Sequence, residues 1–190
     1  MIRTTAATVL ALAGTALAQY EITIDVDNPV LRPGESTTVT MLAGFDPIKY
    51  AMAGIATDLV ASTGSLGLSD AALVSPMDGP GTTAGSPSAT GYDGIIAGQL
   101  NFFNVSYADP TNPIAFWEAT YTAPVDVTNP FDVDLSTMTS RYDVYPEMQR
   151  ASSESQLSEL VEGAATIRVI PAPASASLLA VGLLAMRRRR

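Results

Sequence analysis

The sequence lacks two residue types on which many exported domains and many enzymes depend. Among its 190 residues there is no cysteine and no histidine. Without cysteine a disulfide framework is excluded, so the fold must be held together by its core. Without histidine the Ser-His and Cys-His dyads and the commonest zinc ligand are excluded as well. Carboxylate chemistry, or a Ser-Lys pair using the single lysine, Lys49, would remain. The composition therefore favours a protein that is not an enzyme.

Basic residues are scarce between the two ends of the chain. All 19 acidic residues but only five of the 10 basic ones lie within residues 19–170, which gives that stretch a formal net charge of −14. So acidic a surface makes nucleic acid and anionic membranes poor partners, and it favours solubility, hydrated matrices and cations such as Ca²⁺. These 152 residues are enough for one domain with a substantial core.

The N-terminus has the three parts of a signal peptide. Arg3 supplies the positive charge, residues 6–13 form an apolar segment, and Ala16-Leu17-Ala18 is an A-x-A cleavage pattern. We expect residues 1–18 to form a signal helix that is removed by cleavage between Ala18 and Gln19. The chain is therefore predicted to be exported, to the cell envelope, the cell surface or the extracellular space.

The C-terminus combines two prolines, Pro171 and Pro173, with an apolar segment and a basic end. Residues 174–186 are 13 in number, and Arg187, Arg188, Arg189 and Arg190 follow them. As a helix this segment would reach roughly 20 Å, whereas a bilayer core is about 30 Å thick. We expect a C-terminal hydrophobic helix that inserts transiently, with the arginines on the cytoplasmic side.

Residues 171–190 resemble the PEP-CTERM sorting signal of exported bacterial proteins. In that family a Val-Pro-Glu-Pro-like motif precedes a short apolar helix and an arginine cluster. Pro171, Pro173 and the four arginines match, while Ala172 stands where the family usually has Glu. The resemblance implies recognition by an exosortase-like membrane protease, cleavage near the prolines, and delivery to the cell surface or an exopolysaccharide matrix. An ordinary C-terminal membrane anchor is the alternative.

Between the two ends, the patterning predicts an all-β domain over residues 19–170. In residues 20–26, apolar side chains alternate with Glu21, Thr23 and Asp25, as in a half-buried strand. Further strands are expected at residues 36–42, 52–62, 95–105, 115–122, 131–135 and 164–170, with 141–145 continuing or following the 131–135 strand. Short strands separated by Gly/Pro turns predict an antiparallel β-sandwich of the jelly-roll type.

Three segments depart from the strand pattern. Residues 66–74 are ambiguous and could hold a helical turn capped by Ser69 or Asp70. Residues 75–94, rich in Gly, Pro, Ser and Thr, predict a long surface loop. One short helix is expected near the C-terminus, because Ser153 and Gln156 have capping-box spacing, with an apolar face and a terminal glycine after them (Leu157, Leu160, Val161 and Gly163).

Part of the domain is similar to bacterial extracellular cohesin-like domains. Residues 30–39, Val-Leu-Arg-Pro-Gly-Glu-Ser-Thr-Thr-Val, match the family's Pro-Gly-Asp/Glu turn and the Thr/Val strand that follows it. Residues 54–59 are similar to its Gly-Phe-x-Phe-Asp-Leu strand without the aromatics, and residues 100–102 fit a later apolar strand. The resemblance implies a jelly-roll binding or scaffold module without catalysis.

Two groups of acidic residues are candidates for chemistry. Glu21, Asp25 and Asp27 share one strand or its end, and Asp132 and Asp134 share another. They could be Ca²⁺ ligands or a glycosidase pair, but no EF-hand spacing is present. Carboxylates that alternate with apolar residues are usually a solvated sheet face, which is the interpretation we prefer. No cofactor is otherwise indicated.

The aromatic residues leave a second function open. Trp117, the only tryptophan, lies on an alternating face that favours the core, but an exposed indole would make a sugar-stacking platform, as would Tyr92 or Tyr107. The leading hypothesis is a non-catalytic surface or matrix protein. The alternatives are a carbohydrate-binding module of the exopolysaccharide matrix and, third, a carboxylate-dependent glycoside hydrolase.

Processing at both ends can be tested by the intact mass of the exported protein. We expect an N-terminus at Gln19 and a C-terminus that lacks Arg187 to Arg190, because both signals are cut during export. An exported, untethered protein that still begins at Met1 would contradict the first cleavage. One that retains the four arginines would contradict the second.

Overall fold

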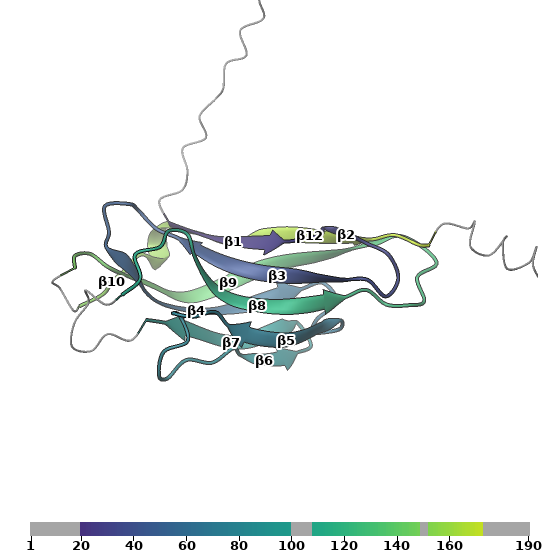
Figure 1. The fold of residues 1–190 in the computed structure, drawn as a ribbon, viewed down its shortest axis with the longest axis horizontal. Coiled ribbons are helices and arrows are strands. Elements are labelled where there is room, and N and C mark those ends of the chain that lie inside the picture. The colour runs from purple at the N-terminus through teal and green to yellow at the C-terminus, as the bar shows by residue number, and fades with distance from the viewer. Residues whose placement is uncertain (1–19, 100–107, 149–151, 173–190) are drawn as a thin grey trace, which may run out of the picture.

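The computed structural model describes residues 20–99, 108–148 and 152–172. They form two packed β-sheets (Figure 1). One sheet has five strands, in the order β11 (Leu160–Val161), β1 (Tyr20–Val26), β3 (Ser36–Gly44), β8 (Ile114–Thr122) and β5 (Leu68–Leu73). The other has the order β2 (Val30–Leu31), β12 (Ala164–Val169), β9 (Phe131–Tyr145), β4 (Ala51–Ala61), β7 (Gly91–Gly98) and β6 (Ser86–Ser88), and β10 (Glu154–Ser155) pairs with β9. The predicted antiparallel β-sandwich is confirmed.

The chain crosses repeatedly from one sheet to the other. It passes from β3 to β4, from β4 to β5, from β7 to β8, from β8 to β9 and from β11 to β12, and each of these steps changes sheet. Most neighbours are antiparallel, and the pairs β1–β11 and β12–β2 are parallel. The loop between β3 and β4 and the end of β12 lie toward opposite ends of the long axis (Figure 1). We call the end where β12 stops the C-terminal tip.

The core between the sheets is built from the inward side chains of the alternating strands. In β1, the buried residues are Tyr20, Ile22 and Ile24, as the alternation predicts. Trp117 is 0 % exposed and packs edge to face against Tyr92, with ring centroids 5.6 Å apart. Its indole N–H donates to the carbonyl oxygen of Ala84 at 3.0 Å, so the one polar atom of the ring has a partner. Trp117 is therefore a core residue.

A β-bulge in β8 buries one more aromatic residue than alternation predicts. Met41 pairs with Trp117 and Leu42 with Ala115, so Phe116 is the extra residue on its strand. Both Phe116 and Trp117 are fully buried. A bulge changes the side-chain alternation locally, so two consecutive side chains can enter the same core.

Tyr142 ties the two sheets together through its hydroxyl group. From β9 it reaches across the core and donates to the carbonyl oxygens of Gly44, at 2.6 Å, and Glu21, at 3.2 Å. These acceptors belong to the paired strands β3 and β1 of the other sheet. The Tyr142 ring also packs edge to face on Tyr20. Burial raises the pKa of the Tyr142 phenol well above its ordinary value, and the nearby Glu21 carboxylate raises it further.

The prediction of a helix that begins at Ser153 is wrong. Residues 152–163 instead hold the short strands β10 and β11, joined by a single 3₁₀ turn, η2 (Leu157–Glu159). Leu157 and Val161 are 37 % and 52 % exposed, so of the supposed apolar face Leu160 alone packs against the core. A short helix is marginal without such packing, and pairing to β9 and β1 satisfies the backbone instead.

Two other segments differ from expectation. Residues 68–73 form the strand β5, not a helical turn, and Asp70 has a φ of 54° where the strand is irregular. The predicted loop 75–94 contains β6 and the start of β7, and Met77 within it is fully buried. The strand expected at 95–105 is β7, which begins at Gly91 and ends at Gly98. Residues 100–107 lie outside the described part.

The outer edges of both sheets are short or interrupted. Strands β2 and β11 have two residues each, and β6 has three, with Pro87 in the middle. The fourth edge, β5, is broken at Asp70. Among the described residues no helix is long and apolar enough to cross a membrane. The signal helix and the C-terminal hydrophobic helix that we predict lie outside those residues.

Removing the Tyr142 hydroxyl should change how stability depends on alkaline pH. A phenol whose pKa is raised in the folded state favours folding up to its unfolded pKa of about 10, and that contribution is lost as pH rises further. We therefore expect Tyr142→Phe to lower the free energy of unfolding by about 1 kcal/mol at neutral pH, and to lose less stability than the wild type above about pH 10.

Urea unfolding at a series of pH values measures both effects. Burial also raises the pKa of Tyr121, so some alkaline loss should persist in the Tyr142→Phe variant. Parallel loss of stability in wild type and variant above pH 10 would contradict the assigned role of Tyr142.

Candidate protein-binding face

The outward surface of β9, β4 and β7 is the candidate site, and we call it the binding face. Its central apolar side chains are Met138 on β9, which is 63 % exposed, and Ile96 on β7, which is 37 % exposed. Met138 pairs with Asp58 on β4, and Ile96 pairs with the half-buried Ala56 two residues earlier on that strand. The register thus places an apolar diagonal across three adjacent strands.

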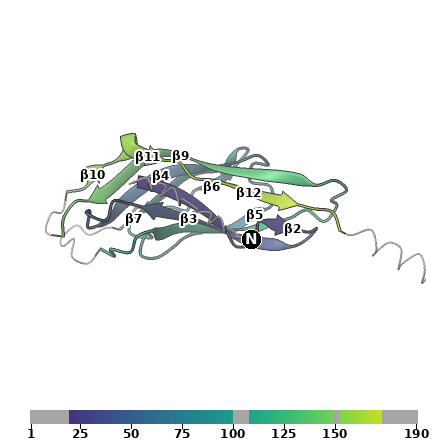
Figure 2. The ribbon, with the colours of Figure 1, turned by 90° about the horizontal axis from the view of Figure 1, so that it is seen from above.

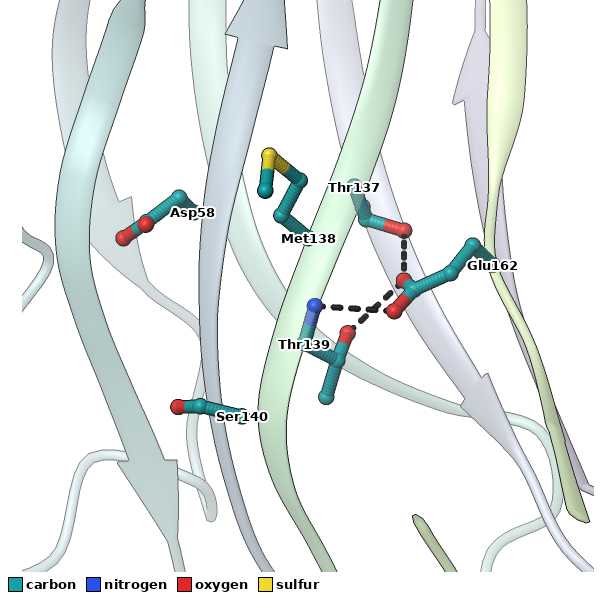
Figure 3. Close-up of a pocket in the computed structure, with 6 residues that line it drawn as sticks. All are labelled: Asp58, Thr137, Met138, Thr139, Ser140 and Glu162. Carbon is teal, nitrogen blue, oxygen red and sulfur yellow. Dashed lines mark hydrogen bonds between the residues drawn. The ribbon is translucent and has the colours of Figure 1, made fainter. Parts of the chain in front are cut away.

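An open depression of about 360 Å³ lies on this face beside Met138. It is lined by Asp58 from β4, by residues 137–140 of β9 and by Glu162. Figure 3 shows Met138 and Ser140 extending over β4 on one side of β9, with the Glu162 carboxylate on the other side. The depression is shallow and suits a side chain of a docked partner better than an enclosed small ligand.

Glu162 forms the rim of the depression by taking the place of a neighbouring strand. The β12 pairing with β9 stops at Ser136, so on this side of β9 residues 137–142 have no strand partner before β10 pairs at Asp143 and Val144. There the Glu162 carboxylate accepts hydrogen bonds from the backbone N–H of Thr139, at 2.8 Å, and from the hydroxyls of Thr137 and Thr139. These bonds order the part of β9 that presents Met138.

Gly163 allows the chain to pass from β11 to β12 at this point. A Cβ at Gly163 would lie 2.9 Å from the carbonyl oxygen of Ile22, too close for any other residue. Its N–H donates to the hydroxyl of Thr137, at 2.8 Å, which in turn donates to Glu162. The sequence suggested Gly163 as the end of a helix. Its actual role is to let two strands approach closely.

The binding face is acidic. Asp58 accepts from the backbone N–H of Gly94 at 2.7 Å, and the exposed Asp93 accepts from the hydroxyl of Ser88. The cation on this part of β9, Arg141, is paired with Asp143 at 2.7 Å. With Glu162 at the rim, the unpaired charge is negative, so a partner with basic side chains is electrostatically complementary.

The Ser-Lys possibility is not supported by the surroundings of Lys49. Its ammonium group lies 3.0 Å from the Glu154 carboxylate. That hydrogen bond raises the pKa of Lys49, even though partial desolvation opposes the shift. A lysine that acts as a general base needs a lowered pKa. Lys49 instead joins the loop before β4 to β10.

The acidic groups suggested as metal ligands are separated. Glu21 and Asp25 lie on β1, with Asp27 just after it, whereas Asp132 and Asp134 lie on β9 of the other sheet. Asp134 accepts from the hydroxyl of Thr166, and Asp132 lies 4.0 Å from Arg168. Within residues 20–99, 108–148 and 152–172, no three acidic side chains are grouped to hold a metal ion. They fit the solvated sheet face that we preferred.

Two of the three proposed sugar-stacking residues are in the core. Trp117 is 0 % and Tyr92 is 7 % exposed, so neither offers a ring face to a sugar. Tyr107 lies outside the described residues, as do Ala18, Gln19, Pro173 and the four terminal arginines. Pro171 is described and directly follows the last hydrogen-bonded residue after β12.

Sequence reasoning missed Met138 and Glu162. Residues 136–140 read Ser-Thr-Met-Thr-Ser, which has too few apolar residues to predict the middle of a long strand. The available signal was a single methionine between threonines, flanked by two predicted strand segments. Glu162 carried no signal, because its role depends on where β12 stops pairing.

The Glu162 hydrogen bonds can be tested by a matched pair of variants. We expect Glu162→Gln to lower the free energy of unfolding by about 1–2 kcal/mol. The reason is that an amide nitrogen would replace the carboxylate oxygen that accepts from the hydroxyls of Thr137 and Thr139. Glu159→Gln, on an exposed residue in the same stretch, should be close to neutral. Urea unfolding measures both variants, and equal effects would contradict the role given to Glu162.

No protein-family model matches the chain, and no curated protein matches it. Solved structures of cohesins do. A type I cohesin–dockerin complex from Clostridium thermocellum, Coh-OlpC with Doc435, matches with a TM-score of 0.50 and 9 % identity over 84 % of this chain and 99 % of that one. The third cohesin of ScaC from Acetivibrio cellulolyticus, in complex with the ScaB dockerin, gives 0.49 and 9 % over 80 % and 99 %. The sixth cohesin of scaffoldin B from the same organism gives 0.48 and 13 % over 80 % and 99 %. The described domain has a cohesin-like β-sandwich fold.

Proposed function

We propose that this chain is a non-catalytic, exported module that binds another protein through the binding face. The observation that carries the proposal is the apolar diagonal of Met138, Ala56 and Ile96 across an otherwise polar sheet. An apolar strip with a polar rim is a common arrangement in protein interfaces. The fold supports the proposal, since the structure that it matches at a TM-score of 0.50 is a cohesin bound to a dockerin.

The partner that suits this face is a protein segment with basic side chains around an apolar one. The apolar side chain would enter the depression beside Met138, and the basic groups would lie near Asp58, Asp93 and Glu162. Such charge complementarity mainly sets specificity and the rate of association, while the buried apolar anchor supplies much of the affinity.

Export and sorting complete the proposal. Residues 1–18 would direct the chain across the membrane, and residues 171–190 would present it to an exosortase-like protease for delivery to the cell surface or an exopolysaccharide matrix. The support for this step is the order of prolines, apolar segment and arginines, together with the strongly acidic, cysteine-free domain between the two signals. The intact-mass measurement described above tests it.

Photo-crosslinking at Met138 tests the binding face. We expect a photoreactive amino acid at position 138, expressed in the source cells, to form protein adducts, because this side chain would lie in the interface. The same group at Ile48, which is 80 % exposed on the loop between β3 and β4, is the matched control and should form few adducts. Gel electrophoresis and mass spectrometry of the adducts measure the difference.

Competition gives the decisive control. Excess purified wild-type domain should suppress the adducts at position 138, whereas a domain carrying Met138→Asp and Ile96→Asp should not, because both changes place charge on the apolar diagonal. Equal adduct formation at positions 48 and 138, or equal competition by the two domains, would overturn the proposal. Adducts with polysaccharide alone would favour the carbohydrate-binding alternative.

A further inference from the structure

The C-terminal tip carries exposed apolar side chains on adjacent loops. Leu66, between β4 and β5, is 70 % exposed, and Val125, between β8 and β9, is 73 % exposed. Backbone hydrogen bonds hold these loops side by side: Thr122 N–H to Gly67 O at 2.8 Å, Ala123 N–H to Glu35 O at 2.9 Å, and Gly34 N–H to Ala123 O at 3.1 Å. Val30, 46 % exposed, lies on β2 beside the end of β12.

The chain leaves the domain at this same tip, and only a short connection separates the domain from the apolar segment. The N–H of Ile170 donates to the carbonyl oxygen of Leu31 at 2.9 Å, so Ile170 is fixed to the sandwich. The apolar segment begins only four residues later, at position 174. Four residues span at most roughly 14 Å even when fully extended. Figures 1 and 2 both show β12 running toward one end of the long axis.

This short connection fixes the position of the tip when residues 174–186 are inserted in a bilayer. The headgroup layer on each side of the hydrocarbon core is roughly 5–8 Å thick. An Ile170 held within roughly 14 Å of the core edge therefore lies in this layer or just above it. The opposite end of the domain, which includes Ile48, is held away from the membrane.

We propose that, in the uncleaved precursor, the C-terminal tip contacts the lipid surface through Leu66 and Val125. This inference rests on the proposed insertion of residues 174–186. The charged groups at the tip are Asp27, Arg32, Glu35 and Asp126, with the pair of Arg168 and Asp132 beside Val30, so the net charge there is negative and a zwitterionic surface suits the contact better than an anionic one. The Glu35 carboxylate already accepts from the N–H of Arg32 at 2.8 Å. The contact would hold Pro171 and Pro173 at the membrane surface, where a membrane-embedded protease acts.

The absence of cysteine makes a labelling experiment simple, because each single-cysteine variant takes one fluorophore. The variants are Leu66→Cys and Val125→Cys at the tip, Ile48→Cys as the exposed control at the other end, and Ala180→Cys within the apolar segment. The full chain from Gln19 to Arg190 is reconstituted into phosphatidylcholine vesicles. We expect blue-shifted emission and quenching by a headgroup-labelled nitroxide lipid at positions 66 and 125, but not at position 48, with position 180 buried in the bilayer.

The label at position 180 separates the two ways in which the inference can fail. If position 180 is buried while positions 66 and 125 behave like position 48, the tip contact is wrong and the inserted tail stands. If position 180 remains in water, the proposed insertion fails and the tip contact fails with it. A shift at positions 66 and 125 that needs no vesicles and grows with protein concentration would assign the tip to a second copy of the chain, overturning the lipid contact.

Discussion

The structure depends on a buried aromatic core in which the indole N–H of Trp117 and the hydroxyl of Tyr142 have hydrogen-bond partners. Trp117 donates to Ala84, and Tyr142 donates to Gly44 and Glu21 across the core. With no disulfide, this burial must supply the stability of a chain that changes sheets at nearly every connection. Because the ring partners come from distant parts of the sequence, the same contacts that stabilise the core also set which strands become neighbours.

Where structure followed from local pattern, the sequence was a sufficient guide. Residues 20–26 and 117–122 alternate strictly, and the side-chain period of two belongs to each strand alone, so their strands and the burial of Trp117 could be predicted. The bulges, the connections that cross between the sheets and the length of β9 could not be predicted. Phe116 is buried because of its register with β3, and residues 153–163 pair with two separate strands instead of forming a helix. Each of these depends on partners far away in the sequence.

The candidate site shows the same division. Acidic residues and aromatics could be identified in the sequence, but their grouping could not, and the acidic groups proved to lie on different sheets. Met138 gained its place on the binding face from strand register, and Glu162 gained its role from the point where β12 stops pairing with β9. A flat sheet face is assembled from several strands, so no short motif in the sequence can encode it.

The short and irregular edge strands affect how copies of this domain associate at high protein concentration. A free strand edge can recruit a copy of itself, and proteins concentrated on a surface meet their own copies constantly. Here β2, β6 and β11 are too short, and β5 is too irregular at Asp70, to extend a ladder from one molecule to the next. Together with the negative charge of the domain, these edges disfavour strand pairing between copies at high local concentration.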